Sequence, residues 1–218
     1  TAHLEMHPEL SVLDVANSLA TGRVGFDRRG TVVAADRSQL AAGLQKIGDG
    51  TAASGGRVAF LFSGQGAQKL GMGRELSTRF PVFAEAYSEI IAAIDPHLSR
   101  ALDDVLDTDQ VHHTEFTQPA LFAFEVALHR LLTSWGVQPE IVAGHSLGEL
   151  TAAHVAGVLS LPDAARLVAA RGRLLGALPT GGAMVAVACA SSALDTLPRG
   201  IDIAAINSPT SVVLSGPE

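Results

Sequence analysis

The stretch "IVAGHSLGEL", residues 141–150, begins as an apolar run, continues through a serine near two glycines and ends in helix-forming residues. Gly144–Gly148 fits the pattern Gly-x-Ser-x-Gly, in which a strand turns sharply into a helix and the glycines leave room for the strained backbone. Two interpretations are open. The glycines only permit a tight turn, or they present Ser146 as a nucleophile. The apolar run before the turn and the helical pattern after it favour the nucleophile.

The helix expected after the turn supplies a second part of an active site. The backbone N–H of Leu147 would face the site, and the N-terminus of the helix adds a partial positive charge suited to an oxyanion. An ordinary α/β-hydrolase also needs an acid and then a histidine after the serine. The only histidine after Ser146 is His154, in the helix that Ser146 begins. The sequence therefore lacks the hydrolase triad, and a serine esterase is disfavoured.

A second glycine turn follows another apolar strand, in "FSGQGAQ", residues 62–68. A dinucleotide-binding fingerprint would need a third glycine at the position that Lys69 occupies, so this function is disfavoured. A plain loop is the alternative. Two junctions between a strand and a glycine turn are better explained together, with backbone N–H groups from both turns meeting at one oxyanion.

Arg171 lies in the middle of an apolar stripe on the helix expected after residue 160. Successive residues of an α-helix are rotated by about 100° around its axis. On this basis six apolar residues lie within about 60° of Arg171 around the helix: Ala164, Leu167, Val168, Leu174, Leu175 and Leu178. An unpaired guanidinium is too costly to bury, so Arg171 needs a partner. The partner is either a carboxylate of the chain or the carboxylate of a ligand, which a guanidinium grips with two parallel bonds.

The histidines and the cysteine indicate no metal centre. The sequence has no His-Glu-x-x-His pattern and a single cysteine, Cys189, so we expect no metal ligands and no internal disulfide. His129, on a helix that is apolar nearly all round, is more typical of a structural residue. His145, beside the candidate nucleophile, either shapes the site or packs.

Composition excludes several classes of function. The chain has 218 residues, 47% hydrophobic and 17% charged, which predicts a folded globular protein. A net charge of −7 argues against a nucleic-acid surface. No apolar run approaches the length of a membrane span, and the first residues do not resemble a signal peptide. With the single cysteine, these features predict a cytoplasmic protein without a membrane or nucleic-acid partner.

The pattern along the chain predicts three parts with α/β architecture. Residues 1–56 form a small α/β linker unit, with helices in "LSVLDVANSLATGR" and "SQLAAGLQKIGDG", a strand in "RRGTVVAAD", Ser38 as an N-cap and a flexible "TAASGG" at its end. Residues 57–182 form the first part of an α/β core. Its strands are expected at 58–62 and 140–146, and its helices at 80–95, 117–136, 147–159 and 161–178, the last with a capping box of Ser160 and Asp163. Residues 183–218 read as strand, helix, strand, strand, an incomplete α+β unit.

These motifs together resemble the acyltransferase domains of modular type I polyketide synthases, and more broadly the malonyl-CoA:acyl-carrier-protein transacylase family. The resemblance runs in order from about residue 57 to the end and rests on "FSGQGAQ", "TQPALFAFE", "GHSLGE", the Arg171–Gly172 pair, "LPTGGAMVAV" and "NSPTSVVLSG". Residues 7–36 are similar to the linker between ketosynthase and acyltransferase domains. The resemblance implies a hydrolase-like core with a mostly parallel sheet flanked by helices, followed by the beginning of a ferredoxin-like subdomain.

The resemblance also implies the roles of individual residues. Ser146 would carry an acyl ester, and the backbone N–H groups of Gln65 and Leu147 would form the oxyanion hole. Arg171 would hold the free carboxylate of a dicarboxylic acyl group, and Gln118 would line the pocket. His145 is a further candidate for substrate binding, on its position beside Ser146 alone. The general base of the family is a histidine in a later segment. We therefore expect the sequence to be a piece of a longer protein that is inactive on its own.

The substrate implied is malonyl-CoA, because Leu147 follows the serine and because "HTEFTQ" and "LPTGGAM" are similar to the malonyl type. Methylmalonyl-CoA or another acyl-CoA is the alternative, and a non-catalytic scaffold piece is another. No permanently bound cofactor is expected. The implied partners are an acyl carrier protein, which presents a phosphopantetheine arm, and the adjacent ketosynthase domain of a multidomain protein that makes polyketides such as antibiotics.

Overall fold

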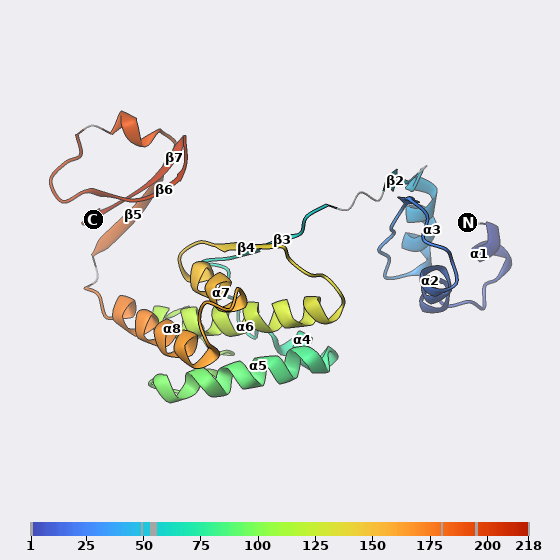
Figure 1. The fold of residues 1–218 in the computed structure, drawn as a ribbon, viewed down its shortest axis with the longest axis horizontal. Coiled ribbons are helices and arrows are strands. Elements are labelled where there is room, and N and C mark those ends of the chain that lie inside the picture. Colours follow the sequence, from blue (N-terminus) through green and yellow to red (C-terminus); the bar gives the residue numbers. More distant parts are fainter. Residues whose placement is uncertain (1, 49, 53–55, 180, 195, 218) are drawn as a thin grey trace. The chain divides into compact units, whose positions relative to one another are not determined.

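The computed structural model describes residues 2–48, 50–52, 56–179, 181–194 and 196–217. The chain divides into two compact units, residues 1–57 and 58–218 (Figure 1). The predicted linker at 51–56 falls partly outside the described residues, because 53–55 are not among them. No helix in the described ranges is long and apolar enough to cross a membrane.

The described residues of the first unit hold three short helices and one pair of very short strands. The helices are α1 (Ala2–Met6), α2 (Val12–Thr21) and α3 (Arg37–Lys46), and the antiparallel strands are β1 (Arg28–Arg29) and β2 (Thr51–Ala52). The strand expected over residues 28–36 is therefore only two residues long. Ser38 is not the N-cap of α3. Asp36 is, because its extended backbone lets its carboxylate accept the N–H of Gln39 at 2.8 Å.

Arg37 joins the helices of this unit. Its guanidinium donates to the backbone carbonyls of His7 and Leu10, both at 2.7 Å, and to that of Leu4 near the end of α1. A planar guanidinium has enough donors to satisfy several carbonyls that the end of a helix leaves without a partner. One side chain of α3 thus stabilises the segment between α1 and α2.

The second unit begins with an α/β core, as the sequence predicts. Two parallel strands, β3 (Ala59–Phe62) and β4 (Ile141–Gly144), pair in register, with Phe62 opposite Gly144. Around them lie the helices α4 (Arg74–Arg79), α5 (Pro81–Ile94), α6 (Thr114–Ser134), α7 (Leu147–Val155) and α8 (Leu161–Gly176). Short 3₁₀ turns span Asp95–His97, Leu102–Asp104 and Asp109–His112. The carboxyl ends of β3 and β4 therefore lie side by side.

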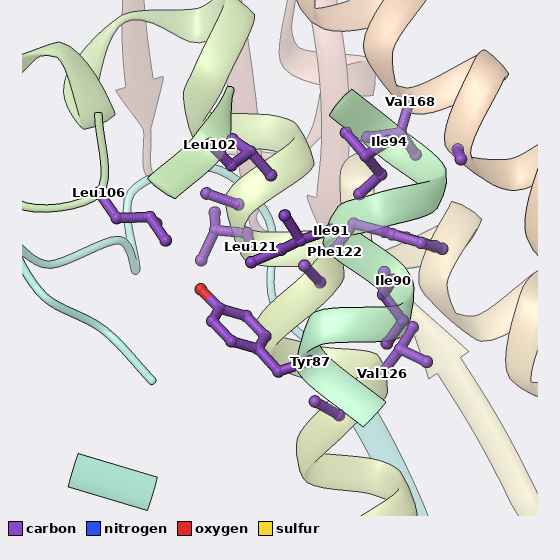
Figure 2. Close-up of a cluster of buried hydrophobic side chains, with 14 of the residues drawn as sticks. Tyr87, Ile90, Ile91, Ile94, Leu102, Leu106, Leu121, Phe122, Val126 and Val168 are labelled. Atoms are coloured by element: carbon purple, nitrogen blue, oxygen red, sulfur yellow. The ribbon is translucent and has the colours of Figure 1, made fainter. Parts of the chain in front are cut away.

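The centre of this core is α6, against which α5, α7 and α8 all pack. As its nearly all-round apolar sequence predicts, α6 is buried on several sides, although it begins at Thr114 and contains Pro119 instead of starting near it. Figure 2 shows how Ile90 and Ile94 of α5 meet Phe122 of α6, all three fully buried. Each such side chain stabilises the fold by about 1.5–3 kcal/mol relative to exposure to water.

The N-terminus of α8 follows the sequence prediction. Ser160 is its N-cap, and the hydroxyl of Ser160 accepts the N–H of Asp163 at 3.2 Å. This cap satisfies one of the N–H groups that the first turn leaves without a partner. The prediction of a capped helix that carries Arg171 in its second half is confirmed.

The last elements form a three-stranded antiparallel sheet. Its strands are β5 (Gly182–Val187), β6 (Asp202–Ser208) and β7 (Ser211–Pro217), in the order β5–β7–β6. The helix expected over residues 191–197 is wrong. The described part of this segment holds only a 3₁₀ turn, Ser191–Ala193, which ends because Leu194 has the non-helical angles φ −111° and ψ 51°.

Candidate active site

Ser146 lies on a strained turn between β4 and α7. Its backbone has φ 57° and ψ −114°, and among the described residues it is the only non-glycine with a positive φ. A side chain held in this sparsely populated conformation costs about 1–3 kcal/mol, and such residues cluster at functional sites. Ser146 is also exposed. Strain and exposure at this turn are the features that the nucleophile interpretation requires.

The two glycines of the motif allow α7 to approach the strands. A Cβ on Gly144 would lie 2.0 Å from the carbonyl oxygen of Gly148, and a Cβ on Gly148 would lie 2.2 Å from the carbonyl oxygen of Phe62. No other residue type fits at either position without movement of the backbone. The glycines therefore serve close packing of β3, β4 and α7 as well as the turn itself.

The second glycine turn meets the first. A Cβ on Gly64 would lie 3.2 Å from the carbonyl oxygen of His145 and 3.8 Å from Cβ of Ser146, so the turn after β3 runs directly beside the serine. Neither the backbone N–H of Gln65 nor that of Leu147 donates a hydrogen bond within the described part of the chain. Two free donors on two adjacent turns are what an oxyanion hole requires.

Arg171 reaches Ser146 from α8. Its Nη2 donates to Oγ of Ser146 at 2.9 Å, and its Nη1 donates to Oε1 of Gln118 at 2.6 Å. In the described ranges, no carboxylate forms an ion pair with Arg171. The half-buried guanidinium therefore meets only neutral acceptors among the described residues.

A chain of side-chain amides extends from Arg171. Gln118 is 1% exposed, and its amide nitrogen lies 3.4 Å from Oε1 of Gln65. The amide nitrogen of Gln65 in turn donates to Oγ1 of Thr114 at 3.1 Å. Ser146, Arg171, Gln118 and Gln65 thus form one network, although Arg171 and Gln118 lie on two different helices and Ser146 and Gln65 on two different turns.

The remaining histidines of this region have other surroundings. The ring of His154 bonds to the carbonyl of Leu159 at 3.0 Å, at the end of α7. His129 lies edge-on to Phe60 with ring centroids 5.7 Å apart, and burial lowers the pKa of its imidazole. His145 is exposed beside Gly64. Across the described residues, no group of three or more His, Cys, Asp or Glu is arranged to hold a metal ion.

A buried carboxylate that no motif of the sequence indicates lies behind the site. Glu125 of α6 is 8% exposed and accepts three hydrogen bonds: from N–H and Oγ of Ser63, and from Oγ1 of Thr151. Burial raises the pKa of the Glu125 carboxyl above its ordinary value, against the opposing effect of these bonds. The available signal was a single glutamate in the apolar run "ALFAFEVAL".

Comparison with known proteins agrees with this geometry. The family described as "Acyl transferase domain" matches residues 59–218, and the family described as "CurL-like, PKS C-terminal" matches residues 1–44. Mycoketide-CoA synthase of Mycobacterium tuberculosis is 54% identical over 95% of this chain, which spans only 5% of that protein. In this relative, the matched region is therefore a small part of a much larger protein.

Solved structures show the same fold. The acyltransferase domain from the second module of the salinomycin polyketide synthase is 48% identical, with a TM-score of 0.77 over 96% of this chain and 53% of that one. A malonyl CoA-acyl carrier protein transacylase from Clostridium perfringens is 30% identical, with a TM-score of 0.64 over 74% of this chain and 54% of that one. The chain spans about half the length of each solved chain. On its matched family, its relatives and its fold, the chain belongs to the acyl transferase domain family, in the branch of the polyketide synthases.

Proposed function

We propose that the protein transfers a malonyl group from malonyl-CoA to the thiol of an acyl carrier protein through an ester on Ser146. The observation that carries this proposal is the contact between Arg171 and the serine. A guanidinium 2.9 Å from Oγ of Ser146, without a carboxylate partner among the described residues, suits an acyl group that ends in a carboxylate.

The proposed reaction has two displacements. Oγ of Ser146 attacks the thioester carbonyl of malonyl-CoA, the CoA thiolate leaves and takes up a proton, and malonyl is left as a serine ester. The thiol of the phosphopantetheine arm then attacks this ester, and Ser146 regains its proton as the new thioester forms. No resident cofactor takes part in these steps.

The other proposed roles follow from position. The N–H groups of Gln65 and Leu147 stabilise the oxyanion of each tetrahedral intermediate, helped by the N-terminus of α7. Gln118 holds the guanidinium of Arg171 in place from the buried side. His145, beside Ser146 at the mouth of the site, shapes the space that the acyl group enters.

The context of the reaction is proposed from the family. The acceptor is a carrier protein with a phosphopantetheine arm, and the neighbouring domain is a ketosynthase, in keeping with the family match of residues 1–44. The single cysteine supports a reducing compartment such as the cytoplasm. Malonyl is preferred over methylmalonyl because Leu147 follows the serine, and competition between the two CoA esters in the full-length protein tests this preference.

The test of the function uses Arg171→Ala in the full-length protein, with malonyl-CoA and acetyl-CoA as substrates. Loss of a charge-assisted bidentate pair should lower kcat/KM for malonyl by about 100-fold or more, because hydrogen bonds to charged groups contribute about 1.5–3 kcal/mol each. Transfer of acetyl, which has no carboxylate, should stay the same or rise.

Arg166→Ala is the matched control, because Arg166 lies on the same helix but pairs with Asp163 on the exposed face. We expect it to leave both transfers unchanged. Equal loss of malonyl and acetyl transfer in Arg171→Ala would contradict the proposed role and make Arg171 a structural residue. Absence of any acyl transfer by the wild-type protein would instead favour a non-catalytic scaffold.

A further inference from the structure

Glu125 connects two segments that the reaction needs close together. Its Oε1 accepts hydrogen bonds from the N–H of Ser63 at 2.8 Å and from the hydroxyl of Ser63 at 2.7 Å. Its Oε2 accepts a hydrogen bond from the hydroxyl of Thr151 at 2.8 Å. Ser63 is the first residue after β3, and Thr151 is in α7. One buried carboxylate of α6 therefore bonds to the loop after β3 with one oxygen and to α7 with the other.

Each partner of Glu125 lies close in sequence to a proposed oxyanion donor. Ser63 precedes Gln65 by two residues, and Thr151 is one helical turn beyond Leu147. The N–H of Ser63 bonds to the carboxylate directly, so the backbone of the loop, and not only a side chain, is fixed. Glu125 therefore links the loop that carries Gln65 to the helix that begins at Leu147.

We infer that Glu125 is a positioning residue that sets the spacing between the backbone N–H groups of Gln65 and Leu147. This inference rests on the proposed function, in which these two groups stabilise the oxyanion. Oxyanion stabilisation requires donors 2.7–3.1 Å from the developing charge. A shift of the loop against α7 by a fraction of this distance separates the donors without touching Ser146 or Arg171.

Stability alone does not explain a carboxylate at this place. Replacement of buried charged groups by apolar residues of similar volume is often neutral or stabilising. Leu121 and Leu128, one turn to either side of Glu125 on α6, show that apolar side chains fit this face of the helix. The carboxylate is the group that can accept from the loop and from α7 at the same time.

The test measures acyl transfer by full-length Glu125→Met and Glu125→Gln variants. Met keeps the volume and loses all three hydrogen bonds. We expect kcat to fall by about 10- to 100-fold, because displaced oxyanion donors stabilise the transition state less, while KM for malonyl-CoA stays within about twofold. Gln should retain most of kcat, because its amide oxygen accepts from Ser63 and its NH₂ donates to the hydroxyl of Thr151.

A second pair of variants, at Thr151, keeps the inference testable if the Glu125 variants fail to fold. Thr151→Val removes the hydroxyl, and Thr151→Ser keeps it, so only Val should lower kcat. Glu89→Gln on α5 is the control for loss of a carboxylate, because Glu89 is exposed and bonds to Arg130 away from the site. The concentration of competent serines is titrated in each variant by the burst of free CoA.

The outcomes separate the positioning role from a structural one. A structural role would reduce the titrated burst and leave kcat per competent serine unchanged, which would overturn the inference. Equal kcat in Thr151→Val and Thr151→Ser, or wild-type kcat in Glu125→Met, would overturn it as well. Persistent transfer by Ser146→Ala would instead refute the proposed function, whatever the Glu125 variants show.

Discussion

The residues of the site come from four segments that lie far apart in the sequence. Arg171 on α8 reaches Ser146 and Gln118, which precede it by 25 and 53 residues. The sequence indicated Ser146 through its glycines and Arg171 through its place in an apolar stripe, because both signals are local. The stripe itself is not buried as expected, since four of its residues are exposed: Leu167, Leu174, Leu175 and Leu178. It left the partner of Arg171 open between an internal carboxylate and a ligand, and the structure supplies no internal carboxylate within the described residues.

Glu125 could not be assigned from the sequence for a physical reason. Its partners are Ser63, 62 residues earlier, and Thr151, 26 residues later, and neither lies on its own helix. A lone carboxylate in an apolar run indicates a buried partner without saying which. Only the packing of α6 against the end of β3 and against α7 defines the bonds.

The raised pKa of the Glu125 carboxyl predicts how stability depends on pH. A native pKa above the ordinary value means that the folded state favours the protonated form, so the contribution of Glu125 is greatest below the ordinary value, 4.5, and is lost as the pH rises through the native value. Thermal unfolding of wild type and Glu125→Gln should show wild type losing stability relative to the variant as pH rises from 4 toward 8. The opposite trend would mean that the three hydrogen bonds outweigh burial.

At the scale of elements, the sequence predicted the type of most helices and strands in the core. Alternation of apolar runs with helical periodicity indicated β3, α5, α6, β4, α7 and α8, and the cap at Ser160 is where the pattern placed it. The short pieces were less predictable. The segment "RRGTVVAAD" contributes only two paired strand residues, Arg28 and Arg29. Asp36, and not Ser38, is the N-cap of α3, because several adjacent polar residues could each begin this helix.

The contact of α7 with the end of β3 predicts the effect of Gly148→Ala. The added Cβ would lie 2.2 Å from the carbonyl oxygen of Phe62 and 2.8 Å from that of Ser63, both backbone atoms. Overpacking of this kind typically costs about 1–3 kcal/mol, and we expect at least that loss in the free energy of unfolding, with acyl transfer reduced as well.

Gly182→Ala is the control for Gly148→Ala, because a Cβ on Gly182 would have its nearest neighbour at 3.8 Å, the carbonyl oxygen of Gly216. Calorimetry of the full-length protein should show a lower melting temperature for Gly148→Ala only. Equal melting temperatures for the two variants would show that α7 can move away from β3, and that the two glycine turns are not held at a fixed distance.

At the scale of the whole molecule, the chain spans about half of the solved acyltransferase chains it matches. Arg171 is the only described residue whose side chain bonds to Oγ of Ser146, and no described histidine does. A serine hydroxyl is a weak nucleophile until a base takes its proton. We therefore expect residues 1–218, expressed alone, to transfer malonyl far more slowly than the full-length protein. Comparable rates per competent serine would show that a histidine of this chain is the base.

The most direct test of the account is the site of acylation. The full-length protein is incubated with malonyl-CoA without a carrier protein, quenched in acid, digested and analysed by mass spectrometry, beside the Ser146→Ala variant. We predict one malonyl group on Ser146 in the wild type and none in the variant, because the elbow exposes this oxygen beside Arg171. A malonyl group on another residue, or an adduct that persists in Ser146→Ala, would show that Ser146 does not carry the acyl group.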